Sequence, residues 1–238
     1  MRAWEQLPET MRSETVKTYY LALKKKRFSL FFKRAFDIFA SLLLLVLLWP
    51  VCLLIGIWIK CDSPGPVIFR QRRVTRYGRV FAIWKFRTMK VNAEQCGPSV
   101  TVREDTRITR SGHFLRRYRL DELPQLVNVL KGDMSFVGTR PEVERYVAAY
   151  TEEMMATLLL PAGITSDASV HFIHEDEMLS AAADADEVYI HEILPQKMAY
   201  NLRYLRDFSL WLDIKLMLTT VARVFHSADD ETEGQETV

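Results

Sequence analysis

An uncharged segment of 22 residues, from Ile38 to Ile59, constrains this chain more than any other feature. A straight helix rises about 1.5 Å per residue, so the segment would be about 33 Å long, which matches the hydrocarbon core of a bilayer. It is too long, and begins too far into the chain, for a cleaved signal peptide. A buried helix of a soluble protein is the weaker alternative, and the sequence predicts a membrane helix.

Both flanks of this segment are basic. Lysine and arginine favour the cytoplasmic side of a bacterial membrane, so both ends are expected on that side. Pro50 removes a backbone donor and clashes with the preceding turn, which bends or breaks a helix. A re-entrant helix over 31–60 that breaks at Pro50 satisfies both flanks, and a spanning helix is the alternative. Ser41 is one candidate partner for the backbone groups that such a break leaves unpaired. The flanking bases are Lys24, Lys25, Lys26, Arg27, Lys33 and Arg34 on one side, and Lys60, Arg70, Arg72, Arg73, Arg76 and Arg79 on the other.

The remaining sequence predicts an α+β protein that is mainly helical. Alternating residues in Val67–Arg70 and Val80–Lys85 predict a small β-hairpin. Helical spacing of apolar residues predicts helices over 104–130, 142–159 and 208–225, and the last of these suits a membrane surface or a core equally well. We divide the chain into an N-terminal extension (1–30) with a short helix or ordered arm, the membrane helix (31–60), a cytosolic globular domain (61–226) and an acidic tail (227–238) that we expect to be disordered.

The formal net charge is +2, but bases are concentrated just after the membrane segment. Nine bases and one acid, Asp62, lie between Lys60 and Lys90. Such a run attracts anionic lipid headgroups, a phosphorylated substrate or a nucleic acid. The neighbouring membrane segment favours the first two, so we expect no nucleic-acid partner. Three cysteines without CxxC spacing exclude a fully paired disulfide framework.

The densest polar cluster lies between Arg116 and Pro124, where Asp121 and Glu122 stand beside three arginines. Nearby cations lower the pKa of a carboxylate and keep it ionised. An ionised aspartate can attack phosphorus, two carboxylates can hold Mg²⁺, and arginines bind phosphate through paired hydrogen bonds. A solvated helix face with ordinary ion pairs is the alternative interpretation.

Several ordered motifs resemble the bacterial sugar transferases, which are monotopic polyprenyl-phosphate phosphoglycosyl transferases. The resemblance extends from about Phe31 to Phe225, and several motifs in order make it specific where one Asp-Glu pair would not. The matching strings are KRAFDIFASLLLLVLLWP, DSPGPVIFRQRRV, FAIWKFRTMK, RLDELPQLVNVLKGDMSFVGTRP, PAGIT and ILPQKMAYNLRYLRDFSLWLDIKLMLTT.

The resemblance implies a mechanism. Asp121 would attack the sugar-bearing phosphate of a nucleotide-diphosphate sugar, release UMP and form a covalent phosphosugar-aspartyl enzyme, and polyprenyl phosphate would then accept the phosphosugar. Glu122 would assist as a metal partner or base, with Mg²⁺ held by Asp121 and Glu122. Arg116 is the first choice for a phosphate ligand and Arg140 the second, with Lys85 and Arg87 as further choices.

The resemblance also implies amphipathic interfacial helices, a helix broken at Pro50 and a location on the cytoplasmic face of the bacterial inner membrane. Membrane lipid would be a partner, and a homodimer is a further option. Three positions depart from the family pattern: Trp49 precedes Pro50 in place of serine, Thr139 replaces a proline, and the sequence after Thr165 differs. The last departure leaves the sugar and the nucleotide open. It also motivates an alternative function, a catalytically weak membrane-bound scaffold or regulator of a glycan assembly complex.

Overall fold

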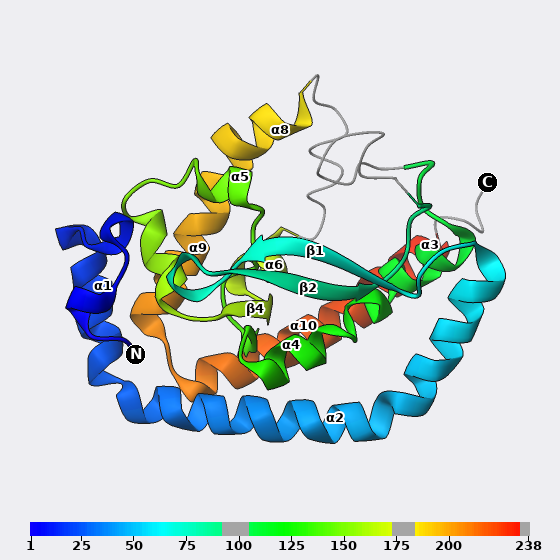
Figure 1. The fold of residues 1–238 in the computed structure, drawn as a ribbon, viewed down its shortest axis with the longest axis horizontal. Coiled ribbons are helices and arrows are strands. Elements are labelled where there is room, and N and C mark those ends of the chain that lie inside the picture. The colour runs from blue at the N-terminus through cyan, green and yellow to red at the C-terminus, as the bar shows by residue number, and fades with distance from the viewer. Residues whose placement is uncertain (92–104, 173–183, 234–238) are drawn as a thin grey trace.

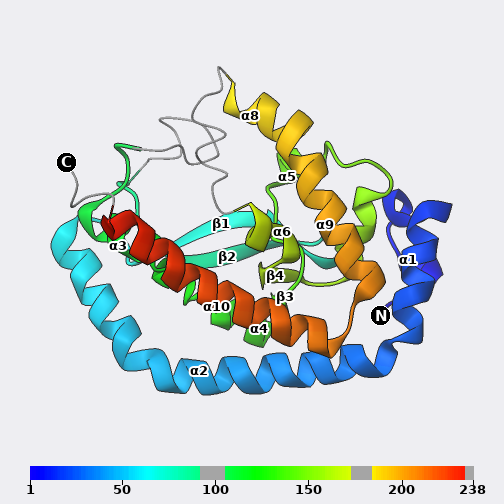
Figure 2. The same ribbon diagram turned by 180° about the vertical axis from the view of Figure 1, so that it is seen from behind.

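The computed structural model describes residues 1–91, 105–172 and 184–233, and within residues 224–233 it describes the backbone alone. Helices surround two small sheets (Figures 1 and 2). The helices are α1 (Glu14–Lys25), α2 (Arg27–Asp62), α3 (Arg110–Arg117), α4 (Gln125–Lys131), α5 (Glu144–Val147), α6 (Asp167–His171), α8 (Ala185–Val188), α9 (Leu194–Asp207) and α10 (Leu210–Glu233). The strands are β1 (Ile68–Val74), β2 (Val80–Phe86), β3 (Met134–Val137) and β4 (Ala162–Thr165). This arrangement confirms the α+β, mainly helical prediction.

The two sheets have two strands each. β1 and β2 form the predicted antiparallel hairpin, in which Ile68 pairs with Phe86 and Val74 with Val80. The turn between them contains Tyr77 and Gly78, both with a positive φ angle. β3 and β4 pair in parallel, and the sequence did not predict this sheet. Asn128 of α4 joins the hairpin to the helical part, because its side chain accepts a hydrogen bond from the Trp84 amide and donates one to the Ala82 carbonyl.

The N-terminal extension is an ordered part of the fold. The side chain of Ser13 caps α1 by accepting a hydrogen bond from the amide of Val16. α1 contributes Val16, Tyr20 and Leu23 to the largest apolar core, together with residues from the 3₁₀ turn Met154–Leu159 and from α9. The predicted short helix is therefore confirmed, and it is packed rather than extended from the domain.

Helix α2 runs along the outside of the molecule and changes direction along its length (Figure 1). It contains 36 residues and keeps Pro50 inside one continuous helix. The predicted break at Pro50 is therefore not observed, because the absence of one N–H group leaves the neighbouring hydrogen bonds to hold the helix together. Ser41 does not serve the residues around Pro50, since its hydroxyl donates to the carbonyl of Ile38 at 3.1 Å.

The start of α2 is joined to the rest of the protein by buried polar contacts. The ammonium group of Lys33 lies 2.6 Å from the carboxylate of Asp213 in α10 and donates to the Val137 carbonyl at 2.8 Å. Tyr204 completes this cluster by donating to Asp213 at 2.7 Å. Arg34 donates to two carbonyls of α4.

The end of α2 contacts the same globular part. Its final residue, Asp62, accepts hydrogen bonds from the amide and the hydroxyl of Ser111, in α3, at 3.0 and 2.8 Å. Arg87 follows β2, and its guanidinium donates to the carbonyls of Ser63 and Pro64. Between these two ends, α2 exposes a long apolar surface, and its most apolar window is 11% buried.

Three predictions of local structure need correction. The expected helix over 104–130 is divided, because Arg119 adopts a left-handed conformation between α3 and the 3₁₀ turn Leu120–Glu122. Gly132 closes α4 as predicted, with a φ angle of 86°. The segment 142–159 forms only the short α5 and a 3₁₀ turn, since the apolar run after Met154 buries consecutive residues rather than one helix face.

The third correction concerns the acidic tail. α10 continues to Glu233 and so includes 227–233, which were predicted to be disordered. No proline or glycine interrupts the sequence before Gly234, and acidic side chains alone do not end a helix. Residues 234–238 lie outside the described residues.

Candidate active site

The Asp121-Glu122 pair lies on a tight 3₁₀ turn that the backbone of Arg119 sets up. Arg119 has φ and ψ angles of 54° and 20°, and its carbonyl accepts a hydrogen bond from the amide of Glu122 at 3.2 Å. The turn buries both carboxylates, leaving Asp121 6% exposed and Glu122 7% exposed. Burial excludes the alternative of a solvated helix face, because a buried charge requires a compensating group.

Two cations from other elements compensate Glu122. The ammonium group of Lys85, in β2, donates to its carboxylate at 3.0 Å. Arg140, which follows β3, donates to the same carboxylate at 2.5 and 3.4 Å. These cations outweigh burial and hold the pKa of Glu122 well below its usual range. Glu122 is therefore an ionised group that fixes the positions of Lys85 and Arg140.

Asp121 has a different environment. Lys85 lies 3.8 Å from its carboxylate, and within the described residues the Asp121 side chain accepts no hydrogen bond. Burial raises the pKa of Asp121, attraction by Lys85 opposes that rise, and the charge of Glu122 adds to it. A buried carboxylate that lacks hydrogen bonds is a suitable ligand for a cation and, once ionised, a reactive nucleophile.

The predicted phosphate ligands separate into two groups. Lys85 and Arg140 meet at Glu122, and Arg116 is close enough for Asp121 to affect its pKa, which burial lowers. The Nε atom of Arg116 donates to the hydroxyl of Thr88 at 2.8 Å. Arg87 is not brought to this cluster. Its guanidinium binds carbonyls at the end of α2, so the structure does not support it as a phosphate ligand.

The turn that carries Arg140 packs closely against β4. The amide of Gly138 donates to the carbonyl of Thr165, and the amide of Gly163 donates to the carbonyl of Thr139. A Cβ atom at Gly163 would lie 2.2 Å from the Gly138 nitrogen, so these two backbones require glycine here. Arg140 reaches Glu122 although Thr139 stands where the family pattern has proline.

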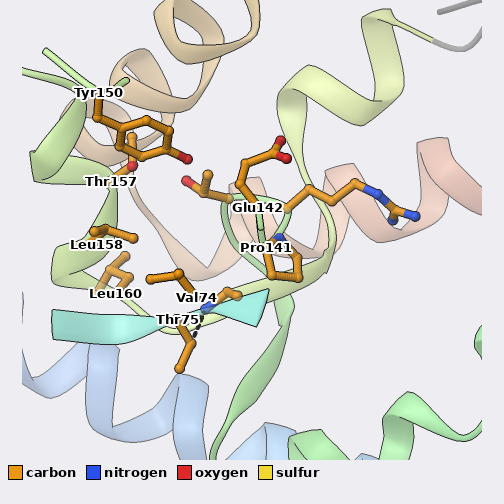
Figure 3. A pocket seen from close by; sticks show the side chains of 11 residues that line it. Val74, Thr75, Pro141, Glu142, Tyr150, Thr157, Leu158 and Leu160 are labelled. Carbon is orange, nitrogen blue, oxygen red and sulfur yellow. Dashed lines mark hydrogen bonds between the residues drawn. The ribbon is translucent and has the colours of Figure 1, made fainter. Parts of the chain in front are cut away.

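A cavity of about 10 Å³ lies behind this turn, lined by residues that include Val74, Pro141 and Leu158 (Figure 3). The hydroxyl oxygen of Thr139 is buried at this cavity and has no hydrogen-bond partner in the described part of the chain. A space of this size holds about one water molecule. It is too small for a substrate, so the substrate site must lie elsewhere.

A second pocket, of about 330 Å³, lies on the open side of Glu122. Its size is at the lower end of the range for small-molecule sites, about 300–1,000 Å³. Leu44 and Leu48 of α2 give it an apolar wall together with the side chains of Leu123, Leu126, Phe136, Ile164, Val170 and Phe172. Its charged lining is Glu122 with the five cations Arg117, Arg119, Arg140, Lys197 and Arg223.

The sequence did not predict several of the residues that line this pocket. Lys197 of α9 is 5% exposed and donates to Tyr189 at 3.0 Å, and Arg223 of α10 donates to the Val170 carbonyl. They lie far from Asp121 along the chain. No helix was predicted over α9, and the helix predicted over 208–225 was expected to face a membrane surface or a core. Ser169, Val170 and Phe172, from the segment after Thr165 that departs from the family pattern, also line the pocket.

Comparison with known proteins finds a matching family model and several similar proteins. The family model described as "Bacterial sugar transferase" matches residues 28–227. A UDP-N-acetylgalactosamine-undecaprenyl-phosphate N-acetylgalactosaminephosphotransferase from Aeromonas hydrophila is 40% identical over 82% of this chain and 44% of its own length. A UDP-glucose:undecaprenyl-phosphate glucose-1-phosphate transferase from Escherichia coli K12 is 37% identical over 81% of this chain and 40% of its own length.

A third relative is matched over a larger share of its own length. It is a UDP-glucose:undecaprenyl-phosphate glucose-1-phosphate transferase from Caulobacter vibrioides, 39% identical over 79% of this chain and 68% of its own length. The chain spans less than half of the Aeromonas and Escherichia relatives that it matches.

Proposed function

Because this chain belongs to the bacterial sugar transferase family, we propose that it transfers a sugar 1-phosphate from a UDP-sugar to a polyprenyl phosphate and thereby begins the assembly of a glycan. The observation that carries the proposal is the pocket beside Glu122. It combines five cations, which suit phosphate groups, with Leu44 and Leu48 of the membrane helix, which suit a lipid chain. A site for a soluble sugar phosphate would need the cations but not the apolar residues of the membrane helix.

In the proposed reaction Asp121 is the nucleophile. An oxygen of its carboxylate attacks the sugar-bearing phosphorus, the bond from that phosphorus to the UMP oxygen breaks, and UMP leaves with the electron pair. An oxygen of polyprenyl phosphate then attacks the same phosphorus and the Asp121 carboxylate is released. Phosphoryl transfer depends mainly on positioning and on neutralising charge. The proximity of Lys85, Arg116 and Arg140 to the two carboxylates supports these roles for them.

The residues present fit a Mg²⁺ ion at Asp121 better than at Glu122. Asp121 accepts no hydrogen bond in the described part of the chain, whereas the Glu122 oxygens are occupied by Lys85 and Arg140. Mg²⁺ commonly binds through one or two carboxylates and substrate phosphates. When bound, the ion would supply charge neutralisation for the phosphate groups. We therefore assign Asp121 as the metal ligand and revise the role of Glu122 to that of holding the two cations.

The contacts at the two ends of α2 support a re-entrant, monotopic arrangement. Lys33 and Arg34 near its start, and Asp62 at its end, all bind the same globular part. A straight helix of 36 residues would be about 54 Å long, so a spanning helix would carry one of these ends away from that part. We propose that the bend region enters one leaflet of the bacterial inner membrane from the cytoplasmic face.

The function is tested by measuring UMP release from a panel of UDP-sugars with Mg²⁺ and undecaprenyl phosphate. We expect release by the wild-type protein with at least one donor and none by Asp121→Asn. Release by Asp121→Asn at the wild-type rate would overturn the assignment of the nucleophile. Absence of release with every donor, from folded protein in nanodiscs, would overturn the proposed activity and favour the scaffold alternative.

The topology is tested separately by cysteine labelling in a background without native cysteines. Lys25→Cys and Lys60→Cys place one exposed thiol at each end of α2. We expect an impermeant reagent to label both from the cytoplasmic side only. Labelling of the two positions from opposite sides of the membrane would instead show a spanning helix.

A further inference from the structure

We propose that Arg119 is an additional phosphate-binding residue of this site, held near the Asp121-Glu122 pair by its left-handed backbone. The inference rests on the proposed function, since it names a contact to a phosphorylated substrate of that reaction. Three observations carry it: the backbone conformation, the position of the charge and the absence of a partner within the protein.

The backbone of Arg119 is unfavourable for an arginine. Apart from glycines, only Tyr77 and Arg119 have a positive φ angle among the described residues. A side chain with a Cβ atom adopts this conformation at a cost that glycine avoids, and such residues cluster at functional sites. The turn alone would be formed more easily by glycine, so a role for the arginine side chain is needed to explain the residue.

The charge of Arg119 lies on the open side of the site. The residue is exposed and lines the pocket of about 330 Å³ beside Glu122. Its guanidinium is close enough to lower the pKa of both Asp121 and Glu122, and it also lowers the pKa of Arg116. Arg119 is therefore within electrostatic reach of the nucleophile, of the carboxylate beside it and of the first-choice phosphate ligand.

The side chain is not used to hold the fold together. Lys85 and Arg140 both pair with Glu122, and Arg116 binds Thr88. By contrast, the guanidinium of Arg119 forms no hydrogen bond or ion pair with any residue that the structure describes. An arginine offers five donors in a planar fork that matches the oxygens of a phosphate, and this fork is available to a substrate at Arg119.

Two substrates could supply the phosphate: the UDP-sugar with its diphosphate, and the lipid acceptor with its single phosphate. Their contributions can be separated because the proposed reaction has two halves. Exchange of labelled UMP into UDP-sugar requires only the donor, whereas formation of the lipid product requires both substrates. Binding of UDP, a non-reacting probe, gives a third measurement that does not depend on turnover.

The experiment compares the wild-type protein with Arg119→Gly, Arg119→Lys and, as a charge control at an exposed position of α3, Arg110→Gln. We expect Arg119→Gly to have an unchanged or higher Tm, because glycine relieves the left-handed backbone. We expect Arg119→Gly to raise the UDP Kd, or the KM for the acceptor, about 10- to 100-fold. This is the effect expected when one hydrogen bond to a charged group is lost. Arg119→Lys should recover part of this loss, and Arg110→Gln should behave as the wild type.

The two arms identify which phosphate Arg119 binds. A higher UDP Kd with slower UMP exchange assigns it to the donor, and a higher acceptor KM with normal exchange assigns it to the acceptor. Wild-type values of both constants in Arg119→Gly would overturn the inference. So would a loss of activity that accompanies a lower Tm and is not recovered by lysine, because that result indicates a structural role. Wild-type protein without exchange or transfer would refute the proposed function itself.

Discussion

The two neighbouring carboxylates of the site should respond oppositely when their charges are removed. Asp121→Asn removes a buried charge that accepts no hydrogen bond from the described residues. The cation Lys85 lies 3.8 Å from this charge. Glu122→Gln removes a charge that two cations hold at 3.0 and 2.5 Å. Both variants should lose UMP release, but only the second should lose stability. The comparison therefore separates the role of a group in the reaction from its role in the fold.

The loss of stability in Glu122→Gln can be estimated from its two cationic partners, Lys85 and Arg140. Removing one member of a buried ion pair costs about 3–5 kcal/mol, because the other member is left buried without compensation. The side chains of Lys85 and Arg140 are 24% and 30% exposed, so solvent screens part of this cost and we expect about 2–3 kcal/mol for Glu122→Gln. For a chain of this size, each kcal/mol lowers Tm by about 2–4 °C, which gives a fall of about 4–12 °C. For Asp121→Asn we expect a change within about 1 kcal/mol, toward higher stability.

The pH dependence gives a second signature. Because the pKa of Asp121 is raised in the folded protein, ionisation of this group reduces stability as the pH rises above its unfolded value of about 3.9. The advantage of Asp121→Asn should therefore grow from acid to neutral pH. The depressed pKa of Glu122 has the opposite sign: its contribution is present above its unfolded pKa and is lost as the pH falls toward its folded pKa.

The assay is thermal unfolding in nanodiscs, followed by tryptophan fluorescence at several pH values. Glu144→Gln is a matched control, because Glu144 pairs with Arg72 at 3.0 Å on the surface, where such pairs contribute little. If Asp121→Asn lowered Tm as far as Glu122→Gln at neutral pH, the charge of Asp121 would be stabilised by the fold. The separation of roles between the two carboxylates would then be refuted.

Three further predictions concern the frame around the site. Gly163→Ala should abolish activity and lower Tm by several degrees in thermal unfolding, because its Cβ atom would lie 2.2 Å from the nitrogen of Gly138. Arg87→Leu should destabilise the junction at the end of α2 by about 2 kcal/mol or more, since several carbonyls lose their donors; faster hydrogen exchange at Ser63 than at α1 would confirm the location. Lys33→Met should cost about 3–5 kcal/mol because Asp213 is left buried without its cation, although it keeps the hydrogen bond from Tyr204, and Lys33→Met with Asp213→Leu should recover much of it in the same unfolding assay.

Local sequence signals predicted much of this fold. Alternation and a Tyr-Gly turn were sufficient for the β-hairpin, and the length and composition of 38–59 for the long apolar helix. The division of 104–130 could not be predicted in the same way, because the apolar spacing continues through Arg119 and only the backbone angle at that residue interrupts the helix. The parallel pairing of β3 with β4 depends on contacts between distant segments that no local pattern carries.

The sequence predicted the residues around Asp121 and Glu122, but it did not predict the pocket residues from α9 and α10. Arg116, Asp121 and Glu122 lie within seven consecutive residues of the sequence. The resemblance to known motifs added Lys85 and Arg140, which the structure brings to Glu122. Arg87 belongs to the same motif as Lys85 but follows the end of the strand and binds α2 instead. Lys197 and Arg223 could not be predicted, because their charges reach the pocket only through the packing of α9 and α10.

The contact between Lys33 and Asp213 also constrains how this protein is made. The two residues are separated by 180 positions, so the apolar helix leaves the ribosome long before its partner exists. At about 5–20 residues per second, roughly 10–35 s pass between the synthesis of the two. During that interval the ammonium group of Lys33 lacks its carboxylate partner. The start of α2 therefore cannot be fixed against α10 until Asp213 has been synthesised.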